Sequence, residues 1–450
     1  MKRFRDNVRS MTAYVPGEQP APGERVIKLN TNENPYPPSP KALAALRDLD
    51  AERLRLYSHP LAREFRDTVA RVLGVPAEWV LPGNGSDDVL GMIFRACAAP
   101  GRPVAYPMPS YTYFRTLAQV QGAEFIEAPF DDEYNLPADA LAAAAAAVTF
   151  VASPNSPSGT PYATAELDAL AARVAGLLVI DEAYVDFADE NALELVRRRE
   201  NVVVLRTMSK GYSLAGLRLG FGVARPEVLA QLVKVKDHYN VSAVACAVGA
   251  AALADQEYRG ECVAKVRASR AKLTGKLEKL GFRVWPSQSN FLLVSPPAGG
   301  PGAKGIYEAL KARGILIRYF HEPRLNDKLR ITVGTDEQNA KLIEALAYLS
   351  DRSDLSDRSD RSDRSAPRRA DYSDYPEKVL QPSGFRAKDG RSPFGGVRTR
   401  PRRRSWLWRS KSRRAAGISG IGWPVPHPAP AGRVTAPAAR AGPPTPPRRR

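Results

Sequence analysis

The sequence predicts an α/β protein in which a mostly parallel sheet is sandwiched by helices, followed by a smaller α+β domain and a disordered tail. Three observations support this fold class. Short apolar runs alternate with helical patterns between Trp79 and Val223. Further apolar runs lead into one closing helical pattern before Ser350. After Ser350 the composition changes to a Ser-Asp-Arg repeat and then to sequence rich in Pro, Arg and Gly, with too few apolar residues to offset the entropy of ordering the chain.

The region from 79 to 223 is expected to form the large sheet. Its predicted strands are E-W-V-L-P-G, P-V-A-Y, A-E-F-I-E-A, V-T-F-V-A-S, L-L-V-I-D and N-V-V-V-L-R. Helical patterns, such as D-D-V-L-G-M-I-F-R-A-C-A and residues 163–175, separate several of them. Ligands of such sheets bind at the carboxyl ends of the strands, where the connecting loops open. We therefore expect the functional site at that edge.

The rest of the chain is divided by the same kinds of pattern. Residues 237–280 are predicted to be mainly helical, and F-R-V-W, S-N-F-L-L-V, G-I-L-I-R and L-R-I-T-V are predicted strands before a helix at 336–349. The N-terminal arm, through N-T-N-E-N-P-Y-P-P-S-P, is too rich in Asn and Pro for regular structure. The predicted organisation is an arm at 1–45 that contributes to the small domain, a large ligand-binding domain at 46–258, a small domain at 259–350 and a tail at 351–450.

The formal charge of +18 lies almost entirely in the tail. Residues 351–450 contain 24 Lys and Arg against 9 Asp and Glu, which leaves 42 against 39 in the first 350 residues. The first 350 residues are therefore balanced like an ordinary globular protein. The tail has two interpretations: an extension without a selected function, or a segment that contacts nucleic acid or a membrane surface through its arginines and W-L-W at 406–408.

Three scattered cysteines, Cys97, Cys246 and Cys262, are too few for a disulfide framework or a zinc site. We expect reduced thiols in a cytoplasmic protein, and no metal. No apolar run approaches the ~20 residues that span a bilayer. No apolar stretch follows the initial M-K-R-F-R-D-N-V-R-S, so we expect no secretory signal.

Five polar motifs follow predicted strands, at the edge where a ligand is expected. They are G-N-G-S-D-D at 83–88, S-Y at 110–111, S-P-N-S-P-S-G at 153–159, I-D-E-A-Y at 180–184 and T-M-S-K-G-Y-S-L-A-G-L-R at 207–218. Each has an ordinary structural explanation, since Asp181 can cap a helix, Asn155 can form a turn, Tyr111 can lie in the core and Lys210 can be a solvated loop residue. Coincidence is a poor explanation for all five in this order at strand ends.

Together the motifs provide the groups that a pyridoxal 5'-phosphate site needs. Such a site needs a lysine that binds the cofactor covalently, an acid that keeps the pyridine nitrogen protonated, an anion cradle and a flat group over the ring. Lys210, Asp181 and Tyr111 are candidates for three of these roles, and the helix that starts after G-N-G can receive the phosphate. A protonated pyridine withdraws electrons from a carbanion at the substrate Cα.

The chain resembles the fold-type I pyridoxal-phosphate aminotransferases, and among them the class-II family of histidinol-phosphate aminotransferases. The resemblance covers about residues 5–350 and depends on the ordered set N-E-N-P, G-S-D-D, S-P-N-S-P-S-G, D-E-A-Y, S-K and A-G-L-R-L-G. It implies an enzyme of histidine biosynthesis that converts histidinol phosphate and 2-oxoglutarate to imidazole-acetol phosphate and glutamate. It also implies a homodimer with shared active sites.

The resemblance assigns roles around the cofactor ring. Lys210 matches the lysine that binds the cofactor, and Asp181 matches the partner of the pyridine nitrogen. Asn155 and Tyr184 match the donors to the phenolic oxygen of the ring, and Tyr111 matches the side chain that stacks on it. Lys210, Asp181 and Tyr184 are therefore the expected catalytic residues.

The resemblance also assigns the groups that bind anions. The cofactor phosphate is expected to be held by backbone groups of Ser86 and Asp87, by the side chains of Thr207, Ser209 and Arg218 and, from the neighbouring subunit, by Tyr57. Arg330 matches the arginine that binds a substrate carboxylate, Arg318 and Tyr14 match groups that bind the substrate phosphate, and Asn155 is also expected at the substrate. Arg318 has a second interpretation as a surface charge at a strand end.

The chain departs from the family pattern at two motifs. G-S-D-D replaces the usual G-S-D-E, which shortens the carboxylate at Asp88, and S-K-G-Y-S has Gly211 and Tyr212 where the family often has Ala and Phe. The second change is expected to alter the packing beneath the cofactor. The alternatives on the same fold are an aromatic amino-acid aminotransferase and a phosphothreonine decarboxylase. The alternative from another functional class is a nucleic-acid-binding protein that uses the basic tail.

Overall fold

The computed structural model describes residues 3–12, 17–21 and 23–359, with only the backbone described for residues 351–359. The expected substrate-binding residue Tyr14 lies outside the described residues. The tail beyond Ser359, with both of its interpretations, lies outside them as well.

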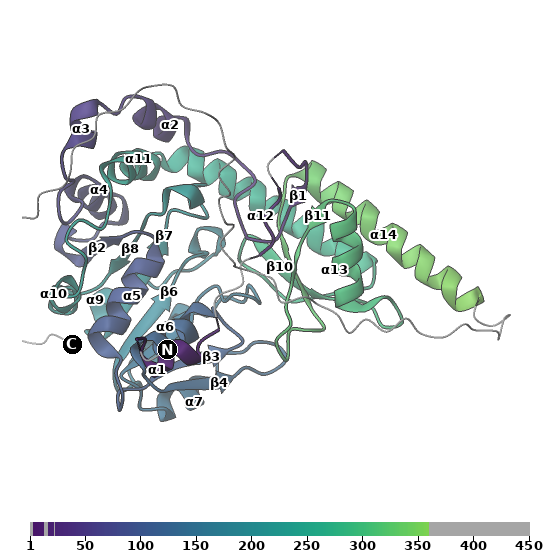
Figure 1. Cartoon of the computed structure of the whole chain (residues 1–450), viewed down its shortest axis with the longest axis horizontal. Coiled ribbons are helices and arrows are strands. Elements are labelled where there is room, and N and C mark those ends of the chain that lie inside the picture. Colours follow the sequence, from purple (N-terminus) through teal and green to yellow (C-terminus); the bar gives the residue numbers. More distant parts are fainter. Residues whose placement is uncertain (1–2, 13–16, 22, 360–450) are drawn as a thin grey trace, which may run out of the picture. The chain divides into compact units, whose positions relative to one another are not determined.

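A seven-stranded sheet forms the centre of the larger part of the chain (Figure 1). Its order is β2-β8-β7-β6-β5-β3-β4, and every neighbouring pair is parallel except the two that include β8. Six strands therefore run in one direction, which confirms the predicted mostly parallel sheet. The strands are β2 (Val80–Gly83), β3 (Val104–Met108), β4 (Phe125–Pro129), β5 (Val148–Ala152), β6 (Leu177–Asp181), β7 (Val202–Thr207) and β8 (Gly220–Val223).

Both faces of this sheet are buried beneath helices. Val179 and Val203 belong to one hydrophobic cluster, whereas Ile180 and Val204, the next residues along each strand, belong to the other. Successive side chains of a strand point to opposite faces, so the unbroken apolar runs are explained by burial on both sides. The helices of one cluster are α5 (Ser86–Cys97), α6 (Tyr113–Gln121) and α10 (Pro226–Val233). The helices of the other are α4 (Arg63–Leu73), α7 (Ala138–Ala143), α8 (Thr164–Ala171), α9 (Leu195–Arg198) and α11 (Ala243–Ala254).

Shorter helical segments complete this part of the chain. They are α1 (Asp6–Ser10), α2 (Pro40–Arg47), α3 (Ala51–Arg55), η1 (Ala77–Trp79), η2 (Val185–Phe187) and η3 (Ala215–Leu217). Side chains cap the starts of several helices, as the oxygen atoms of Ser39 and Ser242 accept hydrogen bonds from backbone N–H groups of α2 and α11. Such caps satisfy N–H groups that have no partner within the helix.

A four-stranded antiparallel sheet of order β12-β13-β10-β9 forms the centre of the smaller part. Its strands are β9 (Arg283–Val284), β10 (Phe291–Ser295), β12 (Arg318–Tyr319) and β13 (Leu329–Thr332). The helices that pack around it are α12 (Gln256–Lys279), α13 (Gly302–Ala312) and α14 (Asp336–Ser359). The predicted strand G-I-L-I-R is divided, because β11 (Ile315–Leu316) pairs instead with β1 (Ile27–Lys28) of the N-terminal arm.

Two predicted boundaries differ from the helices of the structure. α14 continues ten residues beyond the predicted end at Leu349 and so includes the first nine residues assigned to the tail. Residues 336–359 contain no Gly or Pro, so nothing in the sequence interrupts the helix. The predicted boundary between 258 and 259 falls inside α12, which contacts both η2 and β10. The limits of the domains stay predictions.

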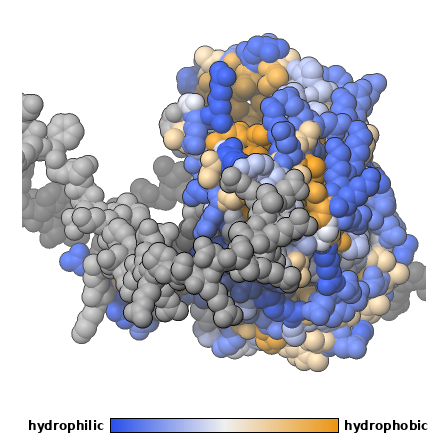
Figure 2. Space-filling model, turned by 90° about the vertical axis from the view of Figure 1, so that its right-hand side faces the viewer, coloured by the Kyte–Doolittle hydropathy of each residue, from blue (hydrophilic) through white to orange (hydrophobic). Residues whose placement is uncertain are grey.

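The surface shown in Figure 2 is largely hydrophilic, with smaller hydrophobic areas between the polar side chains. Among the residues that the structure describes, no helix is both long enough and apolar enough to cross a membrane. All three cysteines are free thiols.

Candidate active site

A cavity of about 340 Å³ lies at the carboxyl ends of the central parallel strands. Ten of the fourteen site residues expected from the sequence line it: Ser86, Asp87, Tyr111, Asp181, Tyr184, Thr207, Ser209, Lys210, Arg218 and Arg330. The lining segments follow β2, β3, β5, β6 and β7. Because these strands run in the same direction, the polar residues after them gather at one edge of the sheet.

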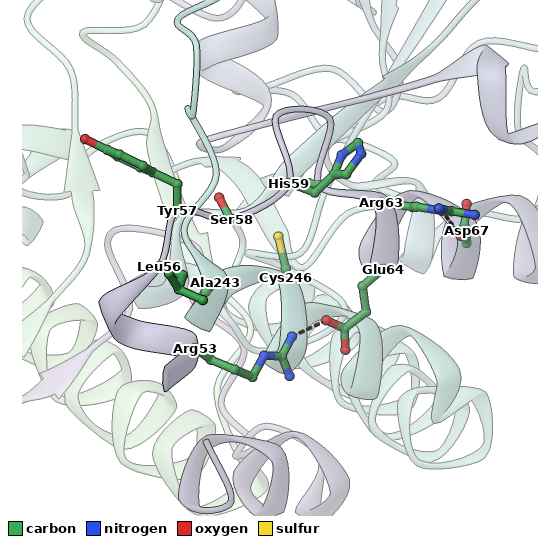
Figure 3. Close-up of a pocket in the computed structure, with 11 residues that line it drawn as sticks. Arg53, Leu56, Tyr57, Ser58, His59, Arg63, Glu64, Asp67, Ala243 and Cys246 are labelled. Carbon is green, nitrogen blue, oxygen red and sulfur yellow. Dashed lines mark hydrogen bonds and ion pairs between the residues drawn. The ribbon is translucent and has the colours of Figure 1, made fainter. Parts of the chain in front are cut away.

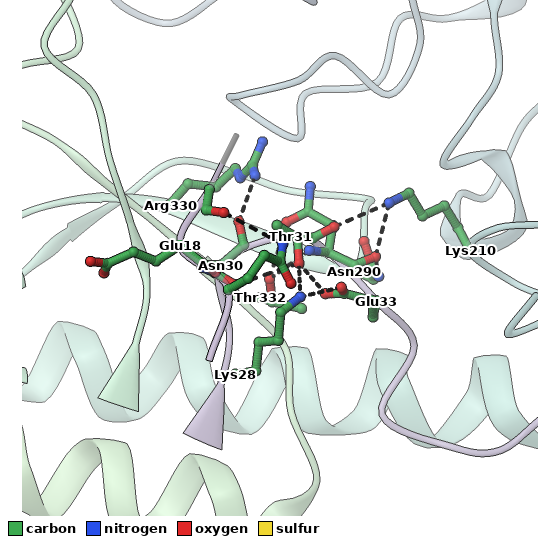
Figure 4. Close-up of polar contacts among 12 residues, drawn as sticks. Glu18, Lys28, Asn30, Thr31, Glu33, Lys210, Asn290, Arg330 and Thr332 are labelled. Atoms are coloured by element: carbon green, nitrogen blue, oxygen red, sulfur yellow. Dashed lines mark hydrogen bonds and ion pairs between the residues drawn. The ribbon is translucent and has the colours of Figure 1, made fainter. Parts of the chain in front are cut away.

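Lys210 lies in the turn that follows β7 and extends toward the N-terminal arm. Its Nζ donates hydrogen bonds to the backbone oxygens of Thr31 and Asn32, at 3.3 and 3.1 Å (Figure 4). It also lies 5.6 Å from the centre of the Tyr184 ring. The amine is therefore held inside the cavity, and the interpretation of Lys210 as a solvated loop residue is wrong.

Asp181 ends β6 with a carboxylate that is 4% exposed. Its one hydrogen bond among the described residues comes from the backbone N–H of Ala183, at 3.1 Å, and no cation pairs with it there. Burial first, and then the negative charge of Asp87, raise the pKa of Asp181 to about 7. A buried carboxylate that lacks a cation and lines a cavity is suited to a positively charged ligand group.

A compact anion cradle lies where α5 begins. Gly85 has φ +84°, and a Cβ at this position would collide with the guanidinium of Arg218. A Cβ at Gly220 would overlap the backbone nitrogen of Ser86. Gly85 therefore leaves room for the Arg218 guanidinium, and Gly220 lets the backbone of β8 approach the N-terminus of α5, where N–H groups and the helix dipole favour an anion.

Polar side chains surround the same cradle. Thr207 donates its hydroxyl proton to Ser209 across 2.9 Å, and the guanidinium of Arg218 contacts the carboxylate of Asp87 at 3.0 Å. Tyr111 donates to the other oxygen of Asp87 at 3.0 Å. Burial first, and then Asp87, raise the pKa of Tyr111 well above its ordinary value, which keeps the phenol neutral.

Asn155 is the one predicted cofactor donor of the large sheet that points away from the cavity. It is fully buried, and its Nδ2 donates to the Ser158 hydroxyl at 3.0 Å and to the Pro109 oxygen at 3.4 Å. Its Oδ1 accepts a hydrogen bond from Ser110 at 2.9 Å. The neighbouring Ser156 lines the cavity instead. The contacts of Asn155 in this structure are therefore those of a residue that stabilises a turn, and they do not include the cavity.

Arg330 and Arg318 are directly paired across strands β12 and β13. Arg330 lines the cavity and donates to the Asn30 oxygen at 3.0 Å and to the Ser156 hydroxyl at 3.3 Å. Both guanidiniums lie over the Phe320 ring, with their carbons 5.7 and 5.4 Å from its centre for Arg330 and Arg318. Like charges directly opposite each other destabilise a sheet unless an anion lies between or beside them. The pair is therefore suited to an anionic ligand group.

Tyr57 lies outside this cavity, in a groove of about 490 Å³ beside α3, α4 and α11 (Figure 3). Its ring is 83% exposed and stacks on Tyr239 with the ring centres 4.5 Å apart. The groove is larger than the cavity around Lys210, but it lacks the groups that the chemistry requires. Tyr57 is thus placed on the surface, outside the cavity that contains Lys210.

The N-terminal arm contributes residues to the cavity that are absent from the set expected from the sequence, because that set relied on the polar motifs that follow the strands of the large sheet. Thr31, Asn32 and Glu33 line the cavity. Figure 4 shows Thr31 and Glu33 in one group of polar contacts with Lys28, next to Lys210. Lys28 contacts both the hydroxyl of Thr31 and the carboxylate of Glu33. Although burial raises it, the pKa of Glu33 is lowered overall by hydrogen bonds from Lys28 and Thr31. The signal available in the sequence was N-T-N-E-N-P-Y, which contains the family motif N-E-N-P.

Pyridoxal 5'-phosphate fits the residues of this cavity. Within the described part of the chain no cation pairs with the carboxylate of Asp181, and a protonated pyridine nitrogen would supply one; the amine of Lys210 can bind an aldehyde. Ser86 at the N-terminus of α5, Thr207, Ser209 and Arg218 line the cavity together, and a phosphate can bind between them. The donor set, its charges and its free space agree with the expected cofactor.

Comparison with known proteins identifies the family. Residues 24–346 match the family described as aminotransferase class I and II. Histidinol-phosphate aminotransferase 1 of Trichormus variabilis is 59% identical over 343 residues, which cover 76% of this chain and 97% of that protein. Histidinol-phosphate aminotransferase of Citrifermentans bemidjiense is 46% identical over 349 residues, which cover 78% and 99%.

A solved structure supports the same assignment. The crystal structure of histidinol-phosphate aminotransferase from Sinorhizobium meliloti in complex with pyridoxal-5'-phosphate has a TM-score of 0.72 and 28% sequence identity to this chain. The similarity covers 78% of this chain and 98% of that one. This chain belongs to the class I and II aminotransferases, within their histidinol-phosphate aminotransferase branch.

Proposed function

We propose that this chain transfers the amino group of histidinol phosphate to 2-oxoglutarate, giving imidazole-acetol phosphate and glutamate in histidine biosynthesis. The observation that carries the proposal is the convergence of Lys210, Asp181 and Arg330 on one cavity. The amine can bind the cofactor, the buried acid can pair with its ring nitrogen, and the guanidinium can bind an anionic substrate. The names of the relatives include one of these substrates, histidinol phosphate.

When bound, pyridoxal 5'-phosphate accepts electrons from the bond that breaks at the substrate Cα. Asp181 supplies the negative charge that keeps the ring nitrogen protonated, and its burial prevents water from screening that charge. Ser86, Thr207, Ser209 and Arg218 are proposed to bind the phosphate. Holding the phosphate fixes the distance between the cofactor and the amine of Lys210.

Lys210 is proposed to be the group that moves the proton. With the cofactor bound, the free Nζ of Lys210 would be the base that takes the proton from the substrate Cα and the acid that gives it back. The backbone oxygens of Thr31 and Asn32 hold this Nζ in the structure, so they limit the positions from which it acts. The second substrate requires the same transfer in the opposite direction.

Arg330 and Arg318 are proposed to bind the anionic end of both substrates. A planar guanidinium forms two parallel hydrogen bonds to a carboxylate, which suits Arg330 to 2-oxoglutarate and glutamate. Arg318, its partner across the strands, supplies a second positive charge for the phosphate of histidinol phosphate. The proposed role of Tyr14 at that phosphate is based on the family resemblance alone.

We also propose that the chain forms a homodimer in which Tyr57 reaches the cofactor phosphate of the other subunit. Large apolar side chains are exposed on α2 and next to Tyr57, including Leu46 at 49%, Leu54 at 62% and Leu56 at 56%. Apolar areas of this kind are typical of protein interfaces. Light scattering should give the mass of two chains, and a monomer at working concentration would contradict this part of the proposal. The free thiols support a cytoplasmic location.

The test of the function is an absorbance spectrum of the purified chain during addition of histidinol phosphate. The visible band of the Lys210-bound cofactor should disappear and the band of the aminated cofactor should appear. Borohydride reduction before addition should leave a mass increase on Lys210. A colourless chain without the mass increase would refute the cofactor. Release of carbon dioxide would instead identify a decarboxylase. Reaction with phenylpyruvate but not with histidinol phosphate would identify an aromatic amino-acid aminotransferase.

A further inference from the structure

Asn32 connects the arm to four distant groups of the site. It is 1% exposed and has φ +58°, a conformation that Asn adopts more readily than most residues. Its backbone nitrogen donates to the Thr332 hydroxyl at 3.0 Å, and its backbone oxygen accepts from Lys210 at 3.1 Å and from Asn290 at 2.9 Å. Its side chain bonds to Thr332 at 3.1 Å and to the Tyr184 hydroxyl at 2.9 Å. All its polar groups are therefore used.

The backbone N–H of Asn32 determines which group donates and which accepts in these hydrogen bonds. The backbone N–H of Asn32 can only donate, so the Thr332 oxygen accepts it. The Thr332 hydroxyl then gives its single proton to Oδ1 of Asn32. This leaves the Nδ2 group of Asn32 facing the Tyr184 oxygen, which accepts the hydrogen bond.

The consequence concerns the proton of Tyr184. A phenol has one proton, and an amide nitrogen cannot accept it, so the Tyr184 hydroxyl must donate in another direction. Among the described residues no acceptor for this proton is found, while Tyr184 lines the cavity. Its ring is fixed edge-on against Phe291, with centres 5.0 Å apart at 85°.

We propose that Asn32 is a positioning residue that keeps the Tyr184 hydroxyl oriented as a donor to the phenolic oxygen of the bound cofactor. This inference rests on the proposed function, because it requires the cofactor at Lys210. A hydrogen bond to that oxygen stabilises its negative charge, which is greatest when the cofactor-lysine nitrogen is unprotonated. Asn32 therefore lowers the pH at which the visible band of the bound cofactor changes.

The test replaces Asn32 by a residue of the same shape that can only accept. In Asn32→Asp the carboxylate should take the Tyr184 proton, so the cofactor oxygen loses its donor. The midpoint pH of the visible band should rise by about one unit, the size expected for one hydrogen bond to a charged group. The new charge alone also raises the midpoint, so the same substitution is made in Tyr184→Phe. There only the charge contributes, and the rise should be clearly smaller.

A second variant tests the inference without a change of charge. Thr332→Val removes the hydroxyl that fixes the Asn32 amide and should raise the midpoint in the same direction, but only when Tyr184 is present. It also serves if Asn32→Asp does not fold, as judged by thermal unfolding and by the borohydride adduct on Lys210.

The outcomes separate this inference from the proposed function. If wild-type protein has no visible band, the proposed function fails. If the band is present, three results would overturn the role of Asn32. These are equal rises for Asn32→Asp with and without the Tyr184 hydroxyl, an unchanged midpoint in Tyr184→Phe alone, or an unchanged midpoint in Thr332→Val.

Discussion

Replacing Asp181 by Asn is expected to change how the stability of the cofactor-free chain depends on pH. Burial raises the pKa of Asp181 in the folded chain from 3.8 to about 7. The unfolded chain releases this proton near pH 4, whereas the folded chain keeps it until about pH 7. Between these values the folded chain binds more protons, so raising the pH favours unfolding. The neutral amide of Asn lacks this dependence.

The size of the effect follows from the shift in pKa. Each pH unit between the two pKa values costs the wild type about 1.4 kcal/mol of unfolding free energy. Between pH 5 and pH 7 this amounts to about 3 kcal/mol for a fully buried carboxylate. Asp181→Asn should therefore gain about 3 kcal/mol relative to the wild type over this range, with no further gain above about pH 7.5.

Urea denaturation of both cofactor-free proteins across this pH range measures the difference. Asp237→Asn removes an exposed carboxylate and should follow the wild type at every pH. Adding pyridoxal 5'-phosphate at pH 8 should stabilise the wild type strongly and Asp181→Asn only weakly, because the amide cannot neutralise the protonated ring nitrogen. Parallel curves for wild type and Asp181→Asn would refute the conclusion that burial raises the pKa of this carboxylate.

Three further predictions concern the surroundings of the site. Gly211→Ala should lower stability by about 1–3 kcal/mol in urea denaturation, because its Cβ would overlap the Asp186 carboxylate, whereas Gly260→Ala in α12 meets no neighbour and should be neutral or stabilising. Equal effects would contradict the packing argument. Arg330→Lys should lower kcat/KM for glutamate about 10- to 100-fold in single-turnover assays, because an ammonium cannot form the two parallel hydrogen bonds; an unchanged value would remove Arg330 from the carboxylate site. Deletion of residues 360–450 should leave transamination unchanged, and a large loss would show that the tail belongs to the enzyme.

The large sheet could be predicted because its signals are local. The runs V-T-F-V-A, L-L-V-I-D and V-V-V-L-R are apolar at every position, which is typical of strands covered on both faces. Once such strands are parallel, the residues after them must gather at one edge, and Asp181, Lys210 and Ser209 do so. The carboxylate of Asp88, where the chain departs from the family pattern, accepts hydrogen bonds from the nearby Asn84 backbone and from the distant Asn240, and Asp88 does not line the cavity.

Features that depend on distant partners could not be predicted. The run G-I-L-I-R has the pattern of one strand, but its first half pairs with β1, more than 280 residues earlier in the chain, and its second half pairs with β13. The direction of the Asn155 side chain is decided by Ser110 and Pro109, which precede it by about 45 residues. No local pattern in the sequence contains this information.

The N-terminal arm shows that a sequence can identify the reactive side chains of a site without identifying the groups that hold them in place. Assigning roles by side-chain type selects Lys210 and Arg330, because amines and guanidiniums have obvious uses. The arm contacts both through backbone oxygens, those of Thr31 and Asn32 for Lys210 and that of Asn30 for Arg330. Any residue has such an oxygen, so residue type gives no signal for this role. The side chain of Asn32 is the exception, and its importance follows from its partners at Tyr184 and Thr332, 152 and 300 residues away. The arm therefore contributes to the site mainly through the position of its backbone, and the pairing of β1 with β11 fixes that position.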